Sequence, residues 1–431
     1  MAGEWRERPL GELTENFDSA RVPVKEADRR GGTYPYYGAS GIVDHVDSYL
    51  FDGEYLLIAE DGENLRTRNT PVAFLARGKF WVNNHAHIVR GNSEADTRFL
   101  MYALAAADIG GYLTGSTMPK LTQGNMNRMP VLVPSLAEQR AIAHILGALD
   151  DKIELNRQMN ETLEAIARAL FKSWFVNFDP VRAKAEGRDP GLPKSLAELF
   201  PDSLDDSELG MIPKGWEVRA LEDVLTKLET GGRPKGGVSK HRAGVPSIGA
   251  ESIVGLGVFD YSKTKYVPPE FFDGMTKGRV QSRDVLLYKD GGRPGEFEPH
   301  VTLFGDGFPF DTCAINEHVY RLRASGGFGQ YLLFFWLSSD LVMEEMRIKG
   351  TGVAIPGLNS TQVKSVTTLV PPHGVARAFD ALVEPLITHV LGSCSESRTL
   401  AILRDTLLPR LMSGELRLSD AHRSMQETPI C

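Results

Sequence analysis

The chain has 431 residues, 42% of them hydrophobic and 24% charged, which predicts two or three compact domains. Its net charge of -8 excludes a protein that binds polyanions through overall charge, although local basic clefts remain compatible with it. No apolar run approaches the ~20 residues that span a bilayer, and three dispersed cysteines without a Cys-x-x-Cys pair favour neither zinc nor disulfides, so we expect a cytoplasmic protein.

Short apolar runs bounded by Gly, Asp and Asn, such as "EYLLIAE" and "FWVNNHAHIVR", predict a β-rich domain over residues 1–133. A helical segment follows over 134–174, then a Pro- and Gly-rich linker over 175–214. The runs "DVLLYK" and "HVYRLRA" predict a second β-rich domain over 215–370. A second helical segment over 371–411 and a tail over 412–431 complete the chain, and each domain is expected to contain a short helix after its strands.

The second half of the sequence repeats the first. Asn83 and His85 in "VNNHAHIVR" match Asn316 and His318 in "INEHVYRLR", and Pro119 matches Pro356. Trp5 and Trp216 head the two copies. Because the matches keep the same order, the sequence predicts two related domains, with loop insertions in the second.

Each copy ends in a long helix with one apolar seam and two polar positions at its centre. In the first helix the seam comprises Ile142, Leu146, Leu149, Ile153, Asn156, Asn160, Leu163 and Leu170. In the second it comprises Phe379, Val383, Leu386, Val390, Leu400 and Leu407, with Ser393 and Ser397 at the centre. Such a helix needs a partner, so we expect the two to pack as an antiparallel coiled coil with their polar centres together.

Two further features of the helices lead to expectations. Pro385 predicts a kink in the second helix, or a late start to its regular part. A second apolar stripe, Ile145, Met159 and Ile166 with Leu382 and Leu403, would stay exposed in a two-helix contact. It therefore predicts another packing surface, either within the chain or on another protein.

No catalytic motif is present: the sequence lacks a phosphate-binding loop, a Gly-x-Gly-x-x-Gly turn and a His-Glu-x-x-His zinc pair. The repeated His beside a repeated Asn favours a structural hydrogen-bonding pair over catalysis. The acidic stretch "AEDGENL" is read as a turn. These observations favour a binding protein with two similar but non-identical binding domains.

Loops rich in Gly, Lys, Arg, Ser and Tyr suit the approach of a backbone to phosphates and of side chains to base edges. The residues nominated for DNA contact in the first copy are Tyr36, Tyr37, Ser40, Arg66, Arg68, Ser116 and Lys120. Those nominated in the second copy are Arg233, Lys235, Lys240, Arg242, Lys289, Arg293, Lys349 and Thr351.

These patterns together resemble the specificity subunits of type I restriction-modification systems, over almost the whole chain. The similarity rests chiefly on the block Pro134 to Phe178, with "YPYYGASGIVDHV", "VNNHAHIVR", "STMPKLTQ", "FDPVRAKAEGR", "LGMIPKGWEV" and "LLPRLMSGEL" in support. The resemblance implies an α+β fold with two target-recognition domains, at 1–133 and 215–370, related by a pseudo-two-fold repeat and separated by two helical spacers.

The resemblance also implies a non-catalytic subunit that reads double-stranded DNA as a bipartite asymmetric site. It implies partners: two modification subunits that methylate adenine with S-adenosylmethionine, and endonuclease subunits that use ATP and Mg²⁺. No cofactor or metal is then expected on this chain itself. The 29 residues of the first seam would form a rod of ~43 Å, long enough to set the spacing of two half-sites.

Two other classes of function remain open on the sequence. A stand-alone DNA methyltransferase or nuclease would act on DNA without partners. A coiled-coil adaptor with two ligand-binding modules would protect no adenine in DNA even when its partner is present.

Overall fold

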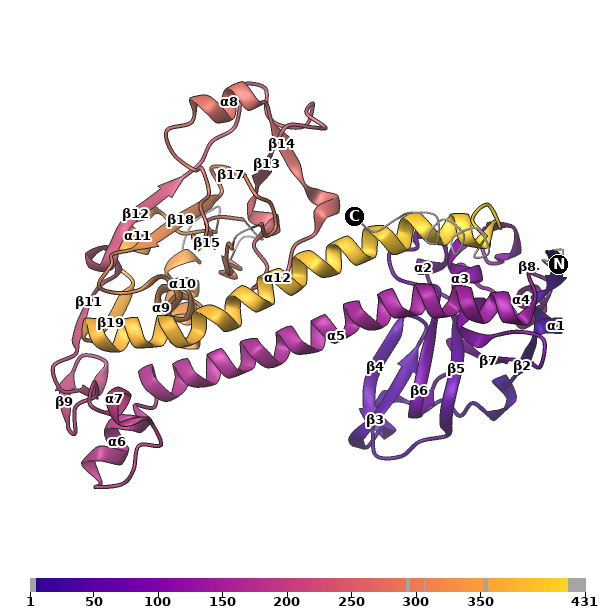
Figure 1. Cartoon of the computed structure of the whole chain (residues 1–431), viewed down its shortest axis with the longest axis horizontal. Helices are drawn as coiled ribbons and strands as arrows, with labels where there is room; N and C mark the ends of the chain where they lie inside the picture. The colour runs from indigo at the N-terminus through magenta and orange to yellow at the C-terminus, as the bar shows by residue number, and fades with distance from the viewer. Residues whose placement is uncertain (1–4, 292–294, 306, 352–355, 418–431) are drawn as a thin grey trace, which may run out of the picture. The chain divides into compact units, whose positions relative to one another are not determined.

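The computed structural model describes residues 5–291, 295–305, 307–351 and 356–417 (Figure 1). The chain forms two compact units, the first comprising Met1–Ile153 with Thr399–Cys431 and the second comprising Glu154–Arg398. The two long helices, α5 (Leu136–Phe175) and α12 (His373–Met412), are each 40 residues long and contribute to both units. The first unit is therefore built from the two ends of the sequence.

The first unit centres on a six-stranded sheet with the strand order β2-β7-β5-β6-β3-β4 (Figure 1). Its strands are β2 (Thr14–Asn16), β3 (Gly31–Gly38), β4 (Gly41–Val46), β5 (Phe51–Ala59), β6 (Ala73–Val82) and β7 (Ala86–Gly91). A separate pair joins β1 (Arg6–Pro9) to β8 (Pro130–Val133). The helices are α1 (Leu10–Leu13), α2 (Asn64–Thr67), α3 (Thr97–Ala106) and α4 (Gln123–Asn127), with 3₁₀ turns η1 (Asp18–Ala20), η2 (Glu26–Asp28) and η3 (Gly110–Tyr112).

Strand β5 shows how the sequence places the core of this unit. Successive side chains of a strand point to opposite faces of the sheet. Leu56 and Ile58 accordingly join the apolar cluster that contains α3, whereas Leu57 joins a cluster with Phe51 and Phe80 on the other face. Both faces of the strand are buried, which explains its continuous apolar run "LLIA".

The second unit has a four-stranded sheet, β12-β18-β15-β16, and a three-stranded sheet, β14-β13-β17 (Figure 1). Their strands are β12 (Leu225–Thr230), β13 (Val245–Ile248), β14 (Lys265–Val267), β15 (Val285–Tyr288), β16 (Val301–Leu303), β17 (Ala314–Ile315) and β18 (Val319–Ala324). Two strand pairs are β9 (Leu204–Ser207) with β10 (Gly210–Pro213), and β11 (Glu217–Ala220) with β19 (Thr367–Val370). The helices are α6 (Asp179–Ala185), α7 (Lys194–Ala197), α8 (Pro269–Gly274), α9 (Gln330–Leu337), α10 (Asp340–Gly350) and α11 (Ser360–Lys364), with 3₁₀ turns η4 (Leu221–Val224), η5 (Ala250–Ser252) and η6 (Tyr261–Lys263).

The internal repeat is confirmed by equivalent strand pairs. In the first unit β1 pairs antiparallel with β8, with Arg6 opposite Val133. In the second unit β11 pairs antiparallel with β19, with Glu217 opposite Val370. The N–H of Leu10 donates to the Met129 carbonyl at 2.8 Å, and its equivalent, Leu221, donates to the Val366 carbonyl at the same distance. Equivalent strand pairs and backbone hydrogen bonds therefore join the first and last strands of the two repeats.

Within each unit, the segments of α5 and α12 pack antiparallel, as the seams predict. In the second unit the buried Asn156 donates through Nδ2 to the Ser393 carbonyl and to the Ser397 hydroxyl, at 3.4 and 3.2 Å. Further along, the Phe171 ring lies 6.1 Å from the Phe379 ring. In the first unit Asp150 is paired with Arg404 at 2.7 Å. The polar centres of the seams thus meet, as expected from their position.

Three expectations differ from the structure. The segment expected to be a linker is folded into the second unit, since Phe178, Val181, Phe200 and Ile212 enter its core. Of the two outcomes expected from Pro385, the late start is wrong, because α12 begins at His373 and stays helical through Pro385. The apolar run after β18 forms two helices, α9 and α10, rather than one, since the run breaks at two consecutive serines.

Within the described ranges, no helix combines the length and the apolar character that crossing a membrane requires.

Candidate nucleic-acid interface

The two units share a small polar structure that we call the clasp. In the first unit the clasp consists of Asp61, His85 and the loop Pro119–Leu121; in the second it consists of Asp290, His318 and Pro356–Leu358. Each His bonds its Asp through Nδ1, at 2.8 Å in the first clasp and 2.5 Å in the second. Both imidazoles are about half exposed, at 52% and 42%.

The same backbone hydrogen bonds hold both clasps. The N–H of Leu121 donates to the Glu60 carbonyl at 2.8 Å, and that of Leu358 donates to the Lys289 carbonyl at 2.7 Å. Gly62 and Gly291 donate to the Pro119 and Pro356 carbonyls, both at 3.1 Å. The two clasps are therefore one structure built twice.

The repeated Asn also has the predicted structural role. The side-chain oxygen of Asn83 accepts from the backbone N–H of His85 at 2.8 Å, and that of Asn316 accepts from His318 at 2.9 Å. This bond fixes the turn that carries each His. In the part of the chain that the structure describes, no group of three or more His, Cys, Asp and Glu side chains is arranged to hold a metal ion.

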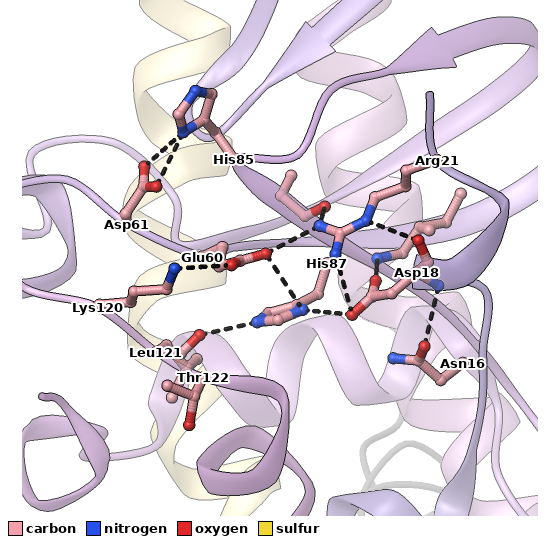
Figure 2. A network of polar contacts seen from close by, with 12 residues as sticks. Asn16, Asp18, Arg21, Glu60, Asp61, His85, His87, Lys120, Leu121 and Thr122 are labelled. Atoms are coloured by element: carbon pink, nitrogen blue, oxygen red, sulfur yellow. Dashed lines mark hydrogen bonds and ion pairs between the residues drawn. The ribbon is translucent and has the colours of Figure 1, made fainter. Parts of the chain in front are cut away.

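Behind the first clasp lies a buried ionic network (Figure 2). His87, with its side chain 2% exposed, bonds Asp18 through Nδ1 at 2.6 Å and the Leu121 carbonyl through Nε2 at 2.8 Å. Glu60 lies 3.8 Å from the same ring, 2.9 Å from Arg21 and 3.2 Å from Lys120. Figure 2 shows how these side chains converge from η1, β5, β7 and the clasp loop, with His85 and Asp61 to one side.

The charges of this network support one another. Burial opposes ionisation of Asp18, but hydrogen bonds from His87 and from the Ile88 amide hold its pKa below the usual value. Burial likewise opposes ionisation of Glu60, while hydrogen bonds from Arg21 and Lys120 lower its pKa. For His87, burial disfavours the cation, yet its bonds to Asp18 and the Leu121 carbonyl raise its pKa. The network is thus a set of paired acids and bases that anchors the clasp loop.

The second clasp uses other side chains on the same frame. Tyr320 stands where the first copy has His87, and its hydroxyl donates to the Leu358 carbonyl at 3.2 Å. Lys289 stands where the first copy has Glu60, and its ammonium lies 3.3 Å from Asp290. Arg233 forms an ion pair with Glu317, the residue before the clasp His, at 2.6 Å.

Beside the second clasp is a basic groove of about 490 Å³. Three lysines line it, together with one carboxylate and four hydroxyl side chains: Lys227, Lys277, Lys289, Glu229, Thr226, Thr230, Tyr320 and Ser360. Glu229 is paired with Arg321. Lys227 and Lys277 are exposed. Ammonium groups and hydroxyls along one groove suit a row of phosphates.

The nominated residues of the first unit have different surroundings. Tyr36 is fully buried and its hydroxyl bonds the backbone of Val24, so it is a core residue and does not reach the surface, against expectation. Tyr37 is half-buried among aromatic rings. Arg68 is held at the end of α3 by the Ala105 and Ala107 carbonyls. Ser40, Arg66, Ser116 and Lys120 are exposed, and Arg66 donates to the carbonyl that precedes Ser116.

In the second unit, Arg233 and Lys289 come together at the clasp. Lys235, Lys240 and Arg242 are exposed on the loop between β12 and β13. Lys349 is tied to Glu345 and to the Ser365 carbonyl, at 2.6 and 2.8 Å, and Thr351 is bonded to the Arg347 carbonyl, so both have structural partners. Arg293 lies outside the described residues.

Sequence reasoning missed several residues of the clasps, of the groove and of the buried network behind them. His87 and Tyr320 were within matched segments, and their shared position two residues after the repeated His was the available signal. Asp61 lies in the acidic stretch that was read as a turn. Lys227 and Lys277 are isolated lysines in the sequence, and only the fold brings them to one groove.

Comparison with known proteins agrees with the duplicated architecture. The family described as "Type I restriction modification DNA specificity domain" matches residues 2–165. The type I restriction enzyme MjaIX specificity subunit of Methanocaldococcus jannaschii is 24% identical over 97% of this chain and 97% of its own length. The type I restriction enzyme HindI specificity subunit of Haemophilus influenzae is 27% identical over 96% of this chain and 100% of its own length.

A solved structure shares the fold. The S subunit of a type I restriction-modification system from M. genitalium superposes with a TM-score of 0.61 at 15% identity, covering 95% of this chain and 96% of that one. The two relatives match this chain almost end to end, and the solved structure shares its overall fold. Along almost its whole length the chain is therefore similar to type I restriction-modification specificity subunits, and residues 2–165 match their DNA specificity domain.

Proposed function

We propose that this chain is the DNA-reading subunit of a type I restriction-modification complex, and that each unit reads one half of a bipartite, asymmetric site in double-stranded DNA. The observation that carries the proposal is the duplicated clasp: one backbone frame holds different side chains in the two units. Lys120 of the first clasp corresponds to Gly357 of the second, and Glu60 corresponds to Lys289. A shared frame with unlike side chains suits two readers of unlike sequence.

The basic groove of the second unit supports a role on the DNA backbone. Phosphate contacts by lysines supply affinity that depends on salt rather than on sequence. Replacing Lys227 and Lys277 by Ala should weaken binding to all DNA sequences and reduce the slope of log affinity against log salt by about 2. A loss confined to one base sequence would contradict a phosphate role.

The long helices are the proposed docking sites for partner subunits. Leu155, Ile166 and Leu382 in the second unit and Ile402 and Leu403 in the first are 41–57% exposed. Of the predicted stripe, Ile145 and Met159 are instead half-buried. We propose two adenine-methylating subunits as the occupants, with endonuclease subunits in the full complex. S-adenosylmethionine, ATP and Mg²⁺ are then expected on those partners in the cytoplasm.

The helices also suit a role in spacing the two half-sites, because each is continuous from one unit into the other. Deleting one heptad from both helices together should shorten the gap between the half-sites or abolish binding. Methylation sites that kept the parental gap in such a variant would contradict this role.

Methylome sequencing of a host that expresses this chain with its modification partner tests the proposal. The expected result is methylated adenine in a split asymmetric motif. Exchanging residues 1–133 for those of another family member should change one half of that motif and leave the other half as a matched internal control. The proposal fails if no adenine is methylated, or if the purified chain transfers methyl groups without a partner.

A further inference from the structure

We propose that His87 and Tyr320 are equivalent positioning residues for DNA reading, and that the use of a titratable ring at the first of these positions makes reading of one half-site, and not the other, weaken as pH rises. This inference rests on the proposed function. It assigns a role to two buried residues that hydrogen-bond the clasp loops.

Geometry establishes the equivalence. His87 on β7 and Tyr320 on β18 each follow the clasp His by two residues. The side chain of each is hydrogen-bonded to the carbonyl of the corresponding loop residue, Leu121 at 2.8 Å and Leu358 at 3.2 Å. Neither side chain is at the surface, since the two residues are 1% and 4% exposed. Both can act on DNA only by fixing the loop.

The anchored loop leads directly into a helix cap in both units. The residue after Leu121 is Thr122, whose hydroxyl accepts from the Asn125 amide and caps α4. The residue after Leu358 is Asn359, which caps α11 in the same way. In the first loop the residue before the anchor is Lys120, which is exposed and nominated for DNA contact. Displacing the anchored carbonyl would therefore shift a candidate DNA contact.

The hydrogen bonds of His87 require a particular protonation state. Nδ1 faces the Asp18 carboxylate and Nε2 faces the Leu121 carbonyl, so both ring nitrogens meet oxygen acceptors. A neutral imidazole carries one N–H and can satisfy only one of them, whereas the imidazolium satisfies both. The pair of bonds is therefore complete only when the ring is charged.

The surroundings of His87 supply charges of both signs. Asp18 from η1 and Glu60 from the end of β5 are the two acids that face the ring. Arg21 lies 3.5 Å from Asp18 and 2.9 Å from Glu60, and Lys120 from the clasp loop lies 3.2 Å from Glu60. Since each acid has a second cation, the cluster carries a net charge of +1 with the imidazolium and none without it.

Tyr320 has different charged neighbours. Lys289 from the end of β15 lies 5.9 Å from the centre of its ring, and the charge of Asp290 also acts on it. Burial raises the pKa of Tyr320 to about 12, so its hydroxyl stays a donor through the physiological range. The second anchor therefore does not titrate where the first does.

The direction of the pH effect follows from linkage. The pKa of His87 is raised above its ordinary value of about 6.5, so its stabilisation of the loop is fully present below that pH. The stabilisation is lost as pH rises through the folded-state pKa. Loss of one hydrogen bond is expected to cost about three- to tenfold in discrimination at the half-site read by the first unit.

The experiment uses the chain in complex with its modification partner and DNA whose half-sites have been mapped by methylation. The measured quantity is the ratio of affinities for matched and mismatched DNA, taken separately for each half from pH 6 to pH 9. A pH effect on the affinity for DNA of any sequence changes both affinities equally and cancels in this ratio. In the parent complex the ratio should fall about three- to tenfold with pH for the first half and stay level for the second.

The internal repeat provides the variants. His87→Tyr, which copies the second unit, should restore a donor that does not titrate and give a level ratio for the first half. Tyr320→His should give the second half a pH dependence that it lacks in the parent. His144→Tyr, which removes an exposed histidine of α5 outside the clasp, is the control and should keep the parental profile.

A direct measurement covers a variant that fails to fold. Nuclear magnetic resonance of the imidazole nitrogens in the parent complex should find that His87 keeps both nitrogens protonated to a higher pH than an ordinary imidazole. The inference is overturned if His87 loses its second ring proton at or below the ordinary imidazole pKa, or if His87→Tyr is folded and keeps the parental slope. If the complex discriminates neither half at any pH, the proposed function fails and this inference fails with it.

Discussion

Replacing Asp284 by Ala should strongly destabilise the second unit. Asp284 is fully buried just before β15, and its ion-pair partner Arg321 is 3% exposed. The carboxylate accepts from Arg321, from Arg323 at 2.6 Å and from the Gln281 amide at 2.7 Å. Its removal takes this acceptor away from two guanidinium groups and from the Gln281 amide.

The expected magnitude follows from these contacts. Breaking a buried ion pair by removing one partner costs about 3–5 kcal/mol. Arg321 keeps Glu229 at 2.6 Å and Gln281 at 3.1 Å, so the expected loss of stability is about 3 kcal/mol, at the lower end of that range. Lys364→Ala is the matched control in the same unit, because its pair with Glu222 is half-exposed and contributes at most about 1 kcal/mol.

Native-state hydrogen exchange on the full chain measures this loss at the amides of β15 and β18, independently of the first unit. Protection there should fall by about two orders of magnitude in Asp284→Ala and by less than one in Lys364→Ala. Equal effects of the two substitutions would refute the reasoning that burial of the ion pair sets its contribution.

Three further outcomes are expected. Asn160→Leu should raise the stability of the second unit by about 1 kcal/mol in chemical denaturation, because the buried Oδ1 of Asn160 has no hydrogen-bond partner within the described ranges. Asn156→Leu should not raise it, since the Asn156 Nδ2 donates to acceptors on α12, three of which lie within hydrogen-bond distance. Asp380→Ala should reduce protection of the first turn of α9 by about 1–2 kcal/mol, because its carboxylate accepts from the amides of Gln330, Tyr331 and Leu332, and Asp380→Asn should do so less. Burial raises the pKa of Cys394 to about 11, so peptide mapping at pH 8 should find it alkylated roughly a hundredfold more slowly than free cysteine.

The repeat and the helix seams were predictable because each depends only on the spacing of residues along the sequence. Asn83 and Asn316 precede their His by the same two positions, and Asn156 and Ser393 occupy matched places in the seams. Such patterns need no knowledge of distant contacts, and the structure gives them the partners that spacing implies.

The surface residues were less predictable because their partners come from elsewhere in the chain. Arg68 was nominated as a free cation, but it holds carbonyls at the end of α3, which lie almost 40 residues later. Tyr36 was nominated from a Gly- and Tyr-rich loop, but the strand it occupies turns it into the core. The partner of His85 is Asp61, which only the pairing of β5 with β7 brings near.

The assignment of residues to units has a consequence for biosynthesis. Leu411 and Met412, at the end of α12, are buried in the same apolar cluster as Leu146, near the start of α5. The ribosome makes most of the first unit before any of the second, yet the first unit lacks part of its interior until the last segment emerges. The second unit, Glu154–Arg398, has all its residues earlier. The domain that is synthesised first should therefore be the one that finishes folding last, and a nascent chain stopped near residue 400 would leave its core open.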